Sequence, residues 1–157
     1  MLTDDQKKVL SFLTENFQVN DIEFQITGGL AAIAYGAKRP LYDIDIDIYK
    51  KDVEKIRELL KEYIVEDWNN DLEGEEDNFD IWMMSLEVEG VPVDISQIEE
   101  SRFRTSGGEW ISQPEAMNTE LRSIEDIELP VQNKQDLIDY KLLIARETDL
   151  EDVRQIS

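Results

Sequence analysis

Apolar and polar residues alternate with helical spacing in several stretches of the chain. Apolar residues recur every three or four positions over about 4–17, and Thr3 and Gln6 in front of them have the spacing of a capping box. The same spacing over about 53–63 follows Asp52, a residue type that caps helix N-termini. Both stretches are therefore predicted to form amphipathic helices.

The last part of the chain repeats this pattern. A helix is predicted from about 134 to 147 with Asn133 as its N-cap, and a short terminal helix follows with Asp149 as its cap. Lys141 lies on the apolar stripe of the first of these helices. It either points into a cleft or packs its stem on the core and keeps its ammonium group in water.

The segments between the predicted helices have the residue pattern of β-strands. Residues 22–27 and 64–68 are rich in β-formers, and residues 43–48 alternate aspartate with isoleucine, as a strand with one polar and one apolar face does. A further short strand is predicted over 123–129. The acidic stretch 69–78 is predicted to be a solvated loop.

Two β-prone runs within residues 79–98 flank Glu89-Gly90, a dipeptide suited to a tight turn, and they predict a hairpin. With this turn, one face of the hairpin carries three apolar pairs, namely Val88 with Val91, Leu86 with Val93, and Met84 with Ile95. Asp94 then lies on the opposite face, across from Ser85.

The composition fits one domain over residues 1–157 and restricts the chemistry that it can perform. The chain contains no cysteine and no histidine, which excludes thiol nucleophiles, zinc-thiolate sites and a histidine base. Catalysis would have to use carboxylates, lysine or a bound metal. No basic leader precedes an apolar stretch, and no apolar run approaches membrane-spanning length, so a cytoplasmic protein is expected.

The charge balance restricts the partners. The chain has 37 acidic and 16 basic residues, a formal net charge of -21. Such a surface repels phosphate backbones and anionic lipid heads at long range, so neither duplex nucleic acid nor a membrane surface is expected to bind. A protein partner is compatible with this charge.

A pair of glycines joins the first predicted strand to an alanine-rich helix over 30–35. At a helix N-terminus, Gly28 and Gly29 offer free backbone amides and allow the close approach that phosphate sites require. Lys38 and Arg39 follow shortly afterwards, either as phosphate contacts or as an ordinary surface pair near a turn.

The polar faces of the strands carry candidate metal ligands. Successive same-face residues such as Asp43 and Asp45 lie roughly 6.6–7 Å apart along a strand, so their carboxylates can converge on divalent ions about 3.5–4 Å apart. Asp94, on the polar face of the hairpin, can supply a third carboxylate. Two alternatives are that Asp45 pairs with Asp47 instead, and that the alternation marks a solvated strand face without metal.

In combination, these motifs resemble the set found in the polymerase-beta-like nucleotidyltransferase superfamily. They are most similar to its small stand-alone bacterial members, which include antibiotic nucleotidyltransferases and abortive-infection toxins. The matching positions are Gly28-Gly29, Arg39, Asp43-Ile44-Asp45, Val93-Asp94-Ile95, Asp136, Lys141, Arg146, Asp149 and Asp152. The spacing from Arg39 favours Asp43 and Asp45 as the metal pair.

The resemblance implies an α+β nucleotidyltransferase fold, a mixed β-sheet with helices packed mainly on one face. Its core would span about 18–98, and its C-terminal helices about 133–157. Residues 99–130 have no counterpart in the resemblance.

The resemblance also implies Mg²⁺-dependent transfer of a nucleoside monophosphate from a nucleoside triphosphate to a hydroxyl of a small molecule, a protein or an RNA end. Asp43 and Asp45 would bind two ions, one of which arrives with the triphosphate. Asp94 would help to bind one ion and would activate the acceptor hydroxyl. The phosphate contacts would come from Gly28, Gly29, Lys38, Arg39 and Lys141.

Two positions depart from the resemblance. Many relatives carry serine at the second glycine position and threonine two residues after the arginine, where this chain has Gly29 and Leu41. These departures and the strong acidity support an alternative function. The chain could be a catalytically inactive member that binds nucleotide or a protein partner, for example in a toxin-antitoxin or defence pair.

Overall fold

A mixed β-sheet forms the centre of the molecule. The structure, a computed structural model, describes residues 1–70 and 78–157. Within these residues, the sheet consists of β1 (Phe24–Thr27), β2 (Ile44–Ile48), β3 (Ile64–Asn69), β5 (Met83–Val88), β6 (Val91–Gln97), β9 (Thr119–Ile124) and β10 (Ile127–Gln132). Their spatial order is β3-β5-β6-β2-β1-β10-β9. The pairs β2/β6 and β1/β10 are parallel and the other neighbours are antiparallel.

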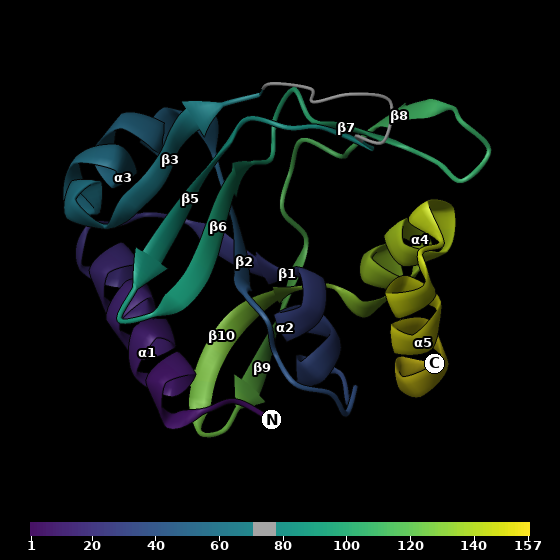
Figure 1. The fold of residues 1–157 in the computed structure, drawn as a ribbon, viewed down its shortest axis with the longest axis horizontal. Helices are drawn as coiled ribbons and strands as arrows, with labels where there is room; N and C mark the ends of the chain where they lie inside the picture. Colours follow the sequence, from purple (N-terminus) through teal and green to yellow (C-terminus); the bar gives the residue numbers. More distant parts are fainter. Residues whose placement is uncertain (71–77) are drawn as a thin grey trace.

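The helices lie in two groups (Figure 1). The α-helices are α1 (Asp4–Val19), α2 (Gly28–Ala34), α3 (Val53–Leu59), α4 (Lys134–Ile144) and α5 (Glu147–Ile156), and the 3-10 turns are η1 (Lys50–Asp52) and η2 (Lys61–Tyr63). Helices α4 and α5 stand side by side and contact α2, apart from α1 and α3. None of the helices among the described residues has the length and apolarity needed to cross a bilayer.

A smaller sheet lies beyond the end of the main one (Figure 1). It consists of β4 (Phe79–Asp80), β7 (Arg102–Arg104) and β8 (Trp110–Ser112), in the order β4-β7-β8. Phe103 of β7 packs edge-on against Tyr140 of α4, with ring centroids 5.1 Å apart. The small sheet therefore contacts α4.

The alternation of β2 separates the hydrophobic core from the polar face of the sheet. Ile44, Ile46 and Ile48 are buried in a cluster that also contains apolar residues of α1 and α3. Because successive strand residues point to opposite faces, the aspartates between these isoleucines face away from that cluster. Helices α1 and α3 cover the apolar face, which confirms the predicted α+β class.

The predicted hairpin register is confirmed between β5 and β6. Val88 pairs with Val91, Leu86 with Val93, and Met84 with Ile95. Asp94 lies across from Ser85 on one side and beside Asp45 of the parallel strand β2 on the other. The predicted hairpin over 79–98 was too long at its start, because Phe79 and Asp80 pair with β7 in the small sheet.

The capping box at Thr3 and Gln6 is confirmed, and α1 continues two residues beyond the predicted end. Asp52 occupies the N-cap position of α3 as predicted, but its side chain accepts no capping hydrogen bond. The reason is local: residues 50–52 already form the 3-10 turn η1, which leads directly into α3.

The C-terminal boundaries differ from the prediction. Helix α4 ends at Ile144 rather than near 147, because Ala145 adopts a left-handed conformation with φ 54°. Asp149 does not cap α5 as predicted. Arg146 holds the N-cap position, and Asp149, three residues into the helix, accepts a hydrogen bond from the Arg146 backbone N–H.

The prediction of one strand over 123–129 is wrong. Glu125 and Asp126 have φ values of 48° and 72° and form the tight turn between β9 and β10. Strand β10 then pairs in parallel with β1, so the hairpin of β9 and β10, which lies beyond the expected core of about 18–98, completes the main sheet. The predicted acidic loop over 69–78 falls largely on 71–77, outside the described residues.

Gly28 joins β1 to α2 and requires a glycine for two reasons. Its φ of +61° lies in the left-handed region, and a Cβ atom on it would overlap Oδ2 of Asp45. The glycine therefore allows the strand-to-helix turn and the side chain of β2 to occupy neighbouring space.

Replacing Gly28 by alanine is expected to destabilise the fold by about 1–2 kcal/mol through its backbone conformation, with a further loss from displacing Asp45. Gly90→Ala is the matched control, since Gly90 has φ +78° but open space around it. Urea denaturation of both variants separates the two effects. Equal losses would show that the contact with Asp45 contributes nothing.

Candidate active site

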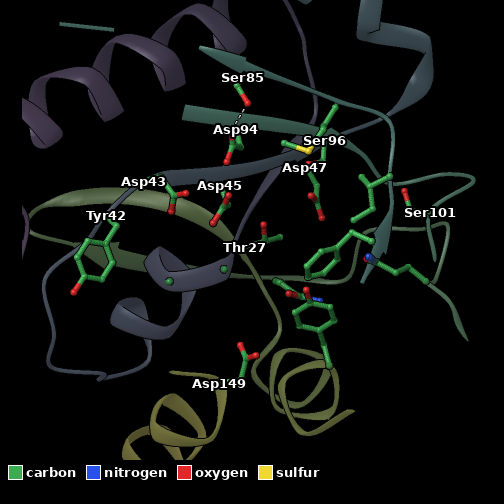
Figure 2. A pocket seen from close by; sticks show the side chains of 18 of the residues that line it. Thr27, Tyr42, Asp43, Asp45, Asp47, Ser85, Asp94, Ser96, Ser101 and Asp149 are labelled. Carbon is green, nitrogen blue, oxygen red and sulfur yellow. Dashed lines mark hydrogen bonds between the residues drawn. The ribbon is translucent and has the colours of Figure 1, made fainter. Parts of the chain in front are cut away.

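Three carboxylates converge on one point at the polar face of the sheet. Each of Asp43, Asp45 and Asp94 offers one oxygen, and these oxygens lie within 4.8 Å of one another. Asp43 immediately precedes β2, Asp45 lies within it, and the parallel register places Asp94 of β6 directly beside Asp45. Figure 2 shows the three side chains pointing into the same space.

The carboxylates line a cavity of about 660 Å³. The polar face of the sheet forms one side of this cavity, and α4 and α5 form the other, where Asp149 lies in Figure 2. Gly28 and Gly29 line it next to the carboxylates. A cavity of this size falls within the usual range for small-molecule sites.

A hydrogen bond orients Asp94. The hydroxyl of Ser85 donates to Asp94 Oδ1 at 2.7 Å across the β5/β6 pair, as the dashed line in Figure 2 shows. Because both residues belong to paired strands of the sheet, the carboxylate is held by a rigid support.

The carboxylates destabilise one another's ionised forms. Burial raises the pKa of Asp45 well above its usual range, and the charges of Asp43, Asp94 and Asp47 raise it further against the opposing charge of Lys141. Burial likewise raises the pKa of Asp94, with further contributions from Asp43 and Glu66, although the Ser85 hydrogen bond opposes the shift.

This arrangement fits a divalent cation. Three carboxylate oxygens are the hard ligands that Mg²⁺ prefers, and a cation among them would offset the repulsion between their negative charges. The residues present therefore suit the ion that the resemblance implies.

Asp47 lines the same cavity but is not part of the converging group. Burial raises its pKa to about 6, and a 3.0 Å hydrogen bond from Gln25 Nε2 opposes the shift. The geometry thus favours Asp43 with Asp45, rather than Asp45 with Asp47, as the pair next to Asp94.

Positive charges face the carboxylates from the other side of the cavity. Lys141 is 3% exposed, and its Nζ lies 3.2 Å from Asp149 Oδ1 and 3.0 Å from Asp152 Oδ2. The alternative in which its ammonium group reaches bulk water is therefore wrong. Arg39 also lines the cavity, and its guanidinium forms a two-point contact with Asp152, Nε to Oδ1 at 2.8 Å and Nη2 to Oδ2 at 3.1 Å.

These ion pairs keep the acids of α5 ionised. Burial alone would raise the pKa of Asp152, but Arg39 and Lys141 outweigh that effect and lower it. Burial also acts to raise the pKa of Asp149, but Arg146 and Lys141 outweigh it, so that this pKa is lowered as well. Both acids are thus negatively charged at neutral pH.

Most of the predicted site residues lie together. The triad, the two glycines, Arg39 and Lys141 all line the cavity, whereas Lys38 is exposed and is not among the described residues that line it. Tyr140 is a further residue of the site that the sequence motifs did not indicate. Tyr140 lines the cavity next to Lys141, and its pKa is raised by burial, with Arg146 opposing the shift and the neighbouring acids adding to it. The sequence signal that could have indicated Tyr140 is its position directly before Lys141.

Comparisons with known proteins agree with the predicted superfamily. Residues 9–156 match the model of a family described as aminoglycoside-2''-adenylyltransferase. No curated protein sequence matches the chain.

Solved structures share the fold. TM1012 from Thermotoga maritima, a protein assigned as a nucleotidyltransferase, is 18% identical with a TM-score of 0.74, over 98% of this chain and 93% of that one. The lincosamide antibiotic adenylyltransferase LnuA, with lincomycin bound, is 17% identical with a TM-score of 0.58, over 99% of both chains.

A third structure, ANT(2'')-Ia in complex with adenylyl-2''-tobramycin, is 12% identical with a TM-score of 0.62, over 95% of this chain and 86% of that one. At such identities these likenesses bear on the fold alone. They confirm the nucleotidyltransferase fold that the motifs predicted.

Adding Mg²⁺ is expected to raise the unfolding temperature, because a ligand at 100 times its Kd stabilises the native state by about 2.7 kcal/mol. Asp45→Asn should raise the unfolding temperature of the metal-free protein, by removing a repelled carboxylate, and should abolish the response to Mg²⁺. Differential scanning calorimetry measures both effects, with Glu87→Gln on the exposed side of β5 as control. An Asp45→Asn protein that still gains the wild-type increment would place the ion elsewhere.

Without metal, stability is expected to increase as the pH falls from about 7.5 toward 5. Asp47 has a pKa of about 6 in the folded protein, above an unfolded value of about 3.9, so the folded state binds the proton more tightly. Asp47→Asn should be more stable than the wild type at pH 7.5 and should lose part of this pH dependence. Urea titrations in the presence of a chelator test this. An unchanged pH profile would contradict it.

Proposed function

We propose that this chain, which belongs to the aminoglycoside-2''-adenylyltransferase family, is a Mg²⁺-dependent nucleotidyltransferase that acts on a small-molecule hydroxyl. The observation that carries the proposal is the convergence of Asp43, Asp45 and Asp94 on one point of a ligand-sized cavity. We place the reaction in the cytoplasm, where nucleoside triphosphates and Mg²⁺ are both available.

In the proposed reaction, the acceptor oxygen attacks the α-phosphorus, the bond to the bridging oxygen breaks, and pyrophosphate leaves. Asp43 and Asp45 would hold two Mg²⁺ ions, with Asp94 as a further ligand of one of them. When bound, the ions supply charge stabilisation for the attacking and leaving oxygens.

Asp94 is the proposed acceptor of the hydroxyl proton. Its pKa is raised by burial and by neighbouring acids, and a base with a raised pKa accepts a proton more readily near neutral pH. Ser85, which donates to Oδ1, would keep the carboxylate in one orientation during the transfer.

The triphosphate would lie between the glycine turn and α4. Gly28 and Gly29 line this cavity, and because they lack side chains, Asp45 and Arg39 can lie directly beside their backbone. Arg39 and Lys141 bring positive charge to the same cavity. Neither histidine nor cysteine is needed, because the chemistry depends on positioning and charge stabilisation.

The acceptor is proposed to be a polyhydroxylated small molecule, and ATP the donor. Two proteins of the same fold support this choice: LnuA, an adenylyltransferase solved with lincomycin, and ANT(2'')-Ia, solved with adenylyl-2''-tobramycin. The acidic lining and the net charge of -21 disfavour an anionic acceptor.

Incubation with Mg²⁺, labelled ATP and a panel of lincosamides and aminoglycosides tests the proposal. Asp43→Asn and Asp94→Asn are expected to reduce turnover by about 100-fold or more, roughly 3 kcal/mol of transition-state stabilisation. Asp47→Asn should lose far less, because Asp47 lies outside the converging group.

A larger loss with Asp47→Asn than with Asp43→Asn would assign the metal pair to Asp45 and Asp47. Absence of turnover with every triphosphate, together with unchanged nucleotide binding in Asp43→Asn, would contradict catalysis and favour a role in binding alone.

A further inference from the structure

Five charged side chains form a continuous network of alternating sign along one side of the cavity. Arg39 contacts Asp152, Asp152 contacts Lys141, Lys141 contacts Asp149, and Asp149 contacts Arg146. We call this set the ion network. It links the loop after α2 to both C-terminal helices, over a sequence separation of more than a hundred residues.

The centre of the network is buried. The side chains of Asp152, Asp149 and Lys141 are 0%, 1% and 3% exposed. Buried charges are tolerated only when they are paired and hydrogen-bonded, so each of these groups depends on its neighbours for its ionised state and its position. Removing one partner would leave the next charge buried and unpaired.

The geometry of Arg39 connects the network to the glycine turn. A Cβ atom on Gly29 would lie 2.5 Å from Arg39 Nη2, so the guanidinium packs directly against the backbone of this residue. Asp152 holds the guanidinium there through two hydrogen bonds, a geometry that fixes its plane as well as its position. A side chain at position 29 would displace it.

We infer that Asp152 and Asp149 are positioning residues, which hold Arg39 and Lys141 at the cavity surface so that both cations face an incoming polyphosphate. The identity of that ligand rests on the proposed function. Neither acid needs to touch the ligand. They fix two long, flexible side chains before the ligand binds. Without them, the entropy lost in ordering Arg39 and Lys141 would reduce the affinity for the polyphosphate.

The charges of the network are consistent with this role. Three cations and two anions leave one net positive charge on this side of the cavity, opposite the carboxylates of the sheet. If attraction of phosphate were the only function of this surface, the two acids would oppose it. Their benefit must therefore be geometric. If the acids position the cations, removing an acid weakens phosphate binding, whereas if they only oppose the attraction, removing an acid strengthens it.

Calorimetric binding of tripolyphosphate at saturating Mg²⁺ tests the inference, because this probe carries the phosphates without base or sugar. Asp152→Asn is expected to weaken binding by about tenfold to a hundredfold, the range for losing charge-assisted hydrogen bonds. Gly29→Ala should cause a similar loss, because its Cβ displaces Arg39 without altering α5. Glu151→Gln is the matched control, since Glu151 is a neighbouring acid of α5 outside the network.

Mn²⁺ binding, measured by electron paramagnetic resonance, reports separately on the three carboxylates. The Mn²⁺ affinity should be unchanged in Asp152→Asn if this substitution disturbs only the positions of Arg39 and Lys141. Binding of tripolyphosphate by Asp152→Asn as tight as, or tighter than, that of the wild type would overturn the inference. So would an equal loss in Glu151→Gln, or a parallel loss of Mn²⁺ binding.

The outcome separates the inference from the proposed function. If wild-type protein binds tripolyphosphate in an Asp152-dependent manner but transfers no nucleotide, the positioning role stands and the proposed reaction fails. If the wild type transfers nucleotide and Asp152→Asn binds tripolyphosphate unchanged, the reaction stands and the positioning role fails.

Discussion

The strict alternation of β2 is the constraint on which the rest of the structure depends. Its isoleucines are buried in the core, and its aspartates face the cavity. A shift of one residue in its pairing would exchange the two sets, placing carboxylates in the core and isoleucines in the cavity. Hydrophobic burial therefore fixes the register, and the register places Asp45 beside Asp94. The convergence of the carboxylates depends in this way on the same interactions that stabilise the fold.

The two sides of the cavity carry opposite net charge and are complementary to each other. Asp43, Asp45 and Asp94 repel one another, and the cations opposite are held by acids that partly neutralise them. Divalent ions would relieve the first side, and a polyphosphate would satisfy the second. A metal-bound triphosphate supplies both at once. This explains how a chain of net charge -21 can be suited to an anionic substrate.

Local patterns predicted the sheet side of the site, and long-range contacts determine the rest. The Glu89-Gly90 turn fixed the phase of the hairpin and thus the face of Asp94, so this position followed from the sequence. The turn between β9 and β10 escaped prediction, because Glu125 and Asp126 adopt positive φ values that favour glycine or asparagine. The partners of Lys141 could not be predicted either. Its position on the apolar stripe of its helix indicated burial, but not which acids would pair with it.

The two sides also differ in how they are supported. The carboxylates project from neighbouring strands backed by the hydrophobic core, and Asp94 is further fixed by Ser85. Arg39 and Lys141 are held by ion pairs to α5, a helix whose main contacts are with α4 and α2. Because the central groups of the ion network are buried, salt screens these ion pairs little while α5 stays in place. The carboxylate side of the cavity is therefore part of the rigid sheet, while the positions of Arg39 and Lys141 depend on the docking of the C-terminal helices.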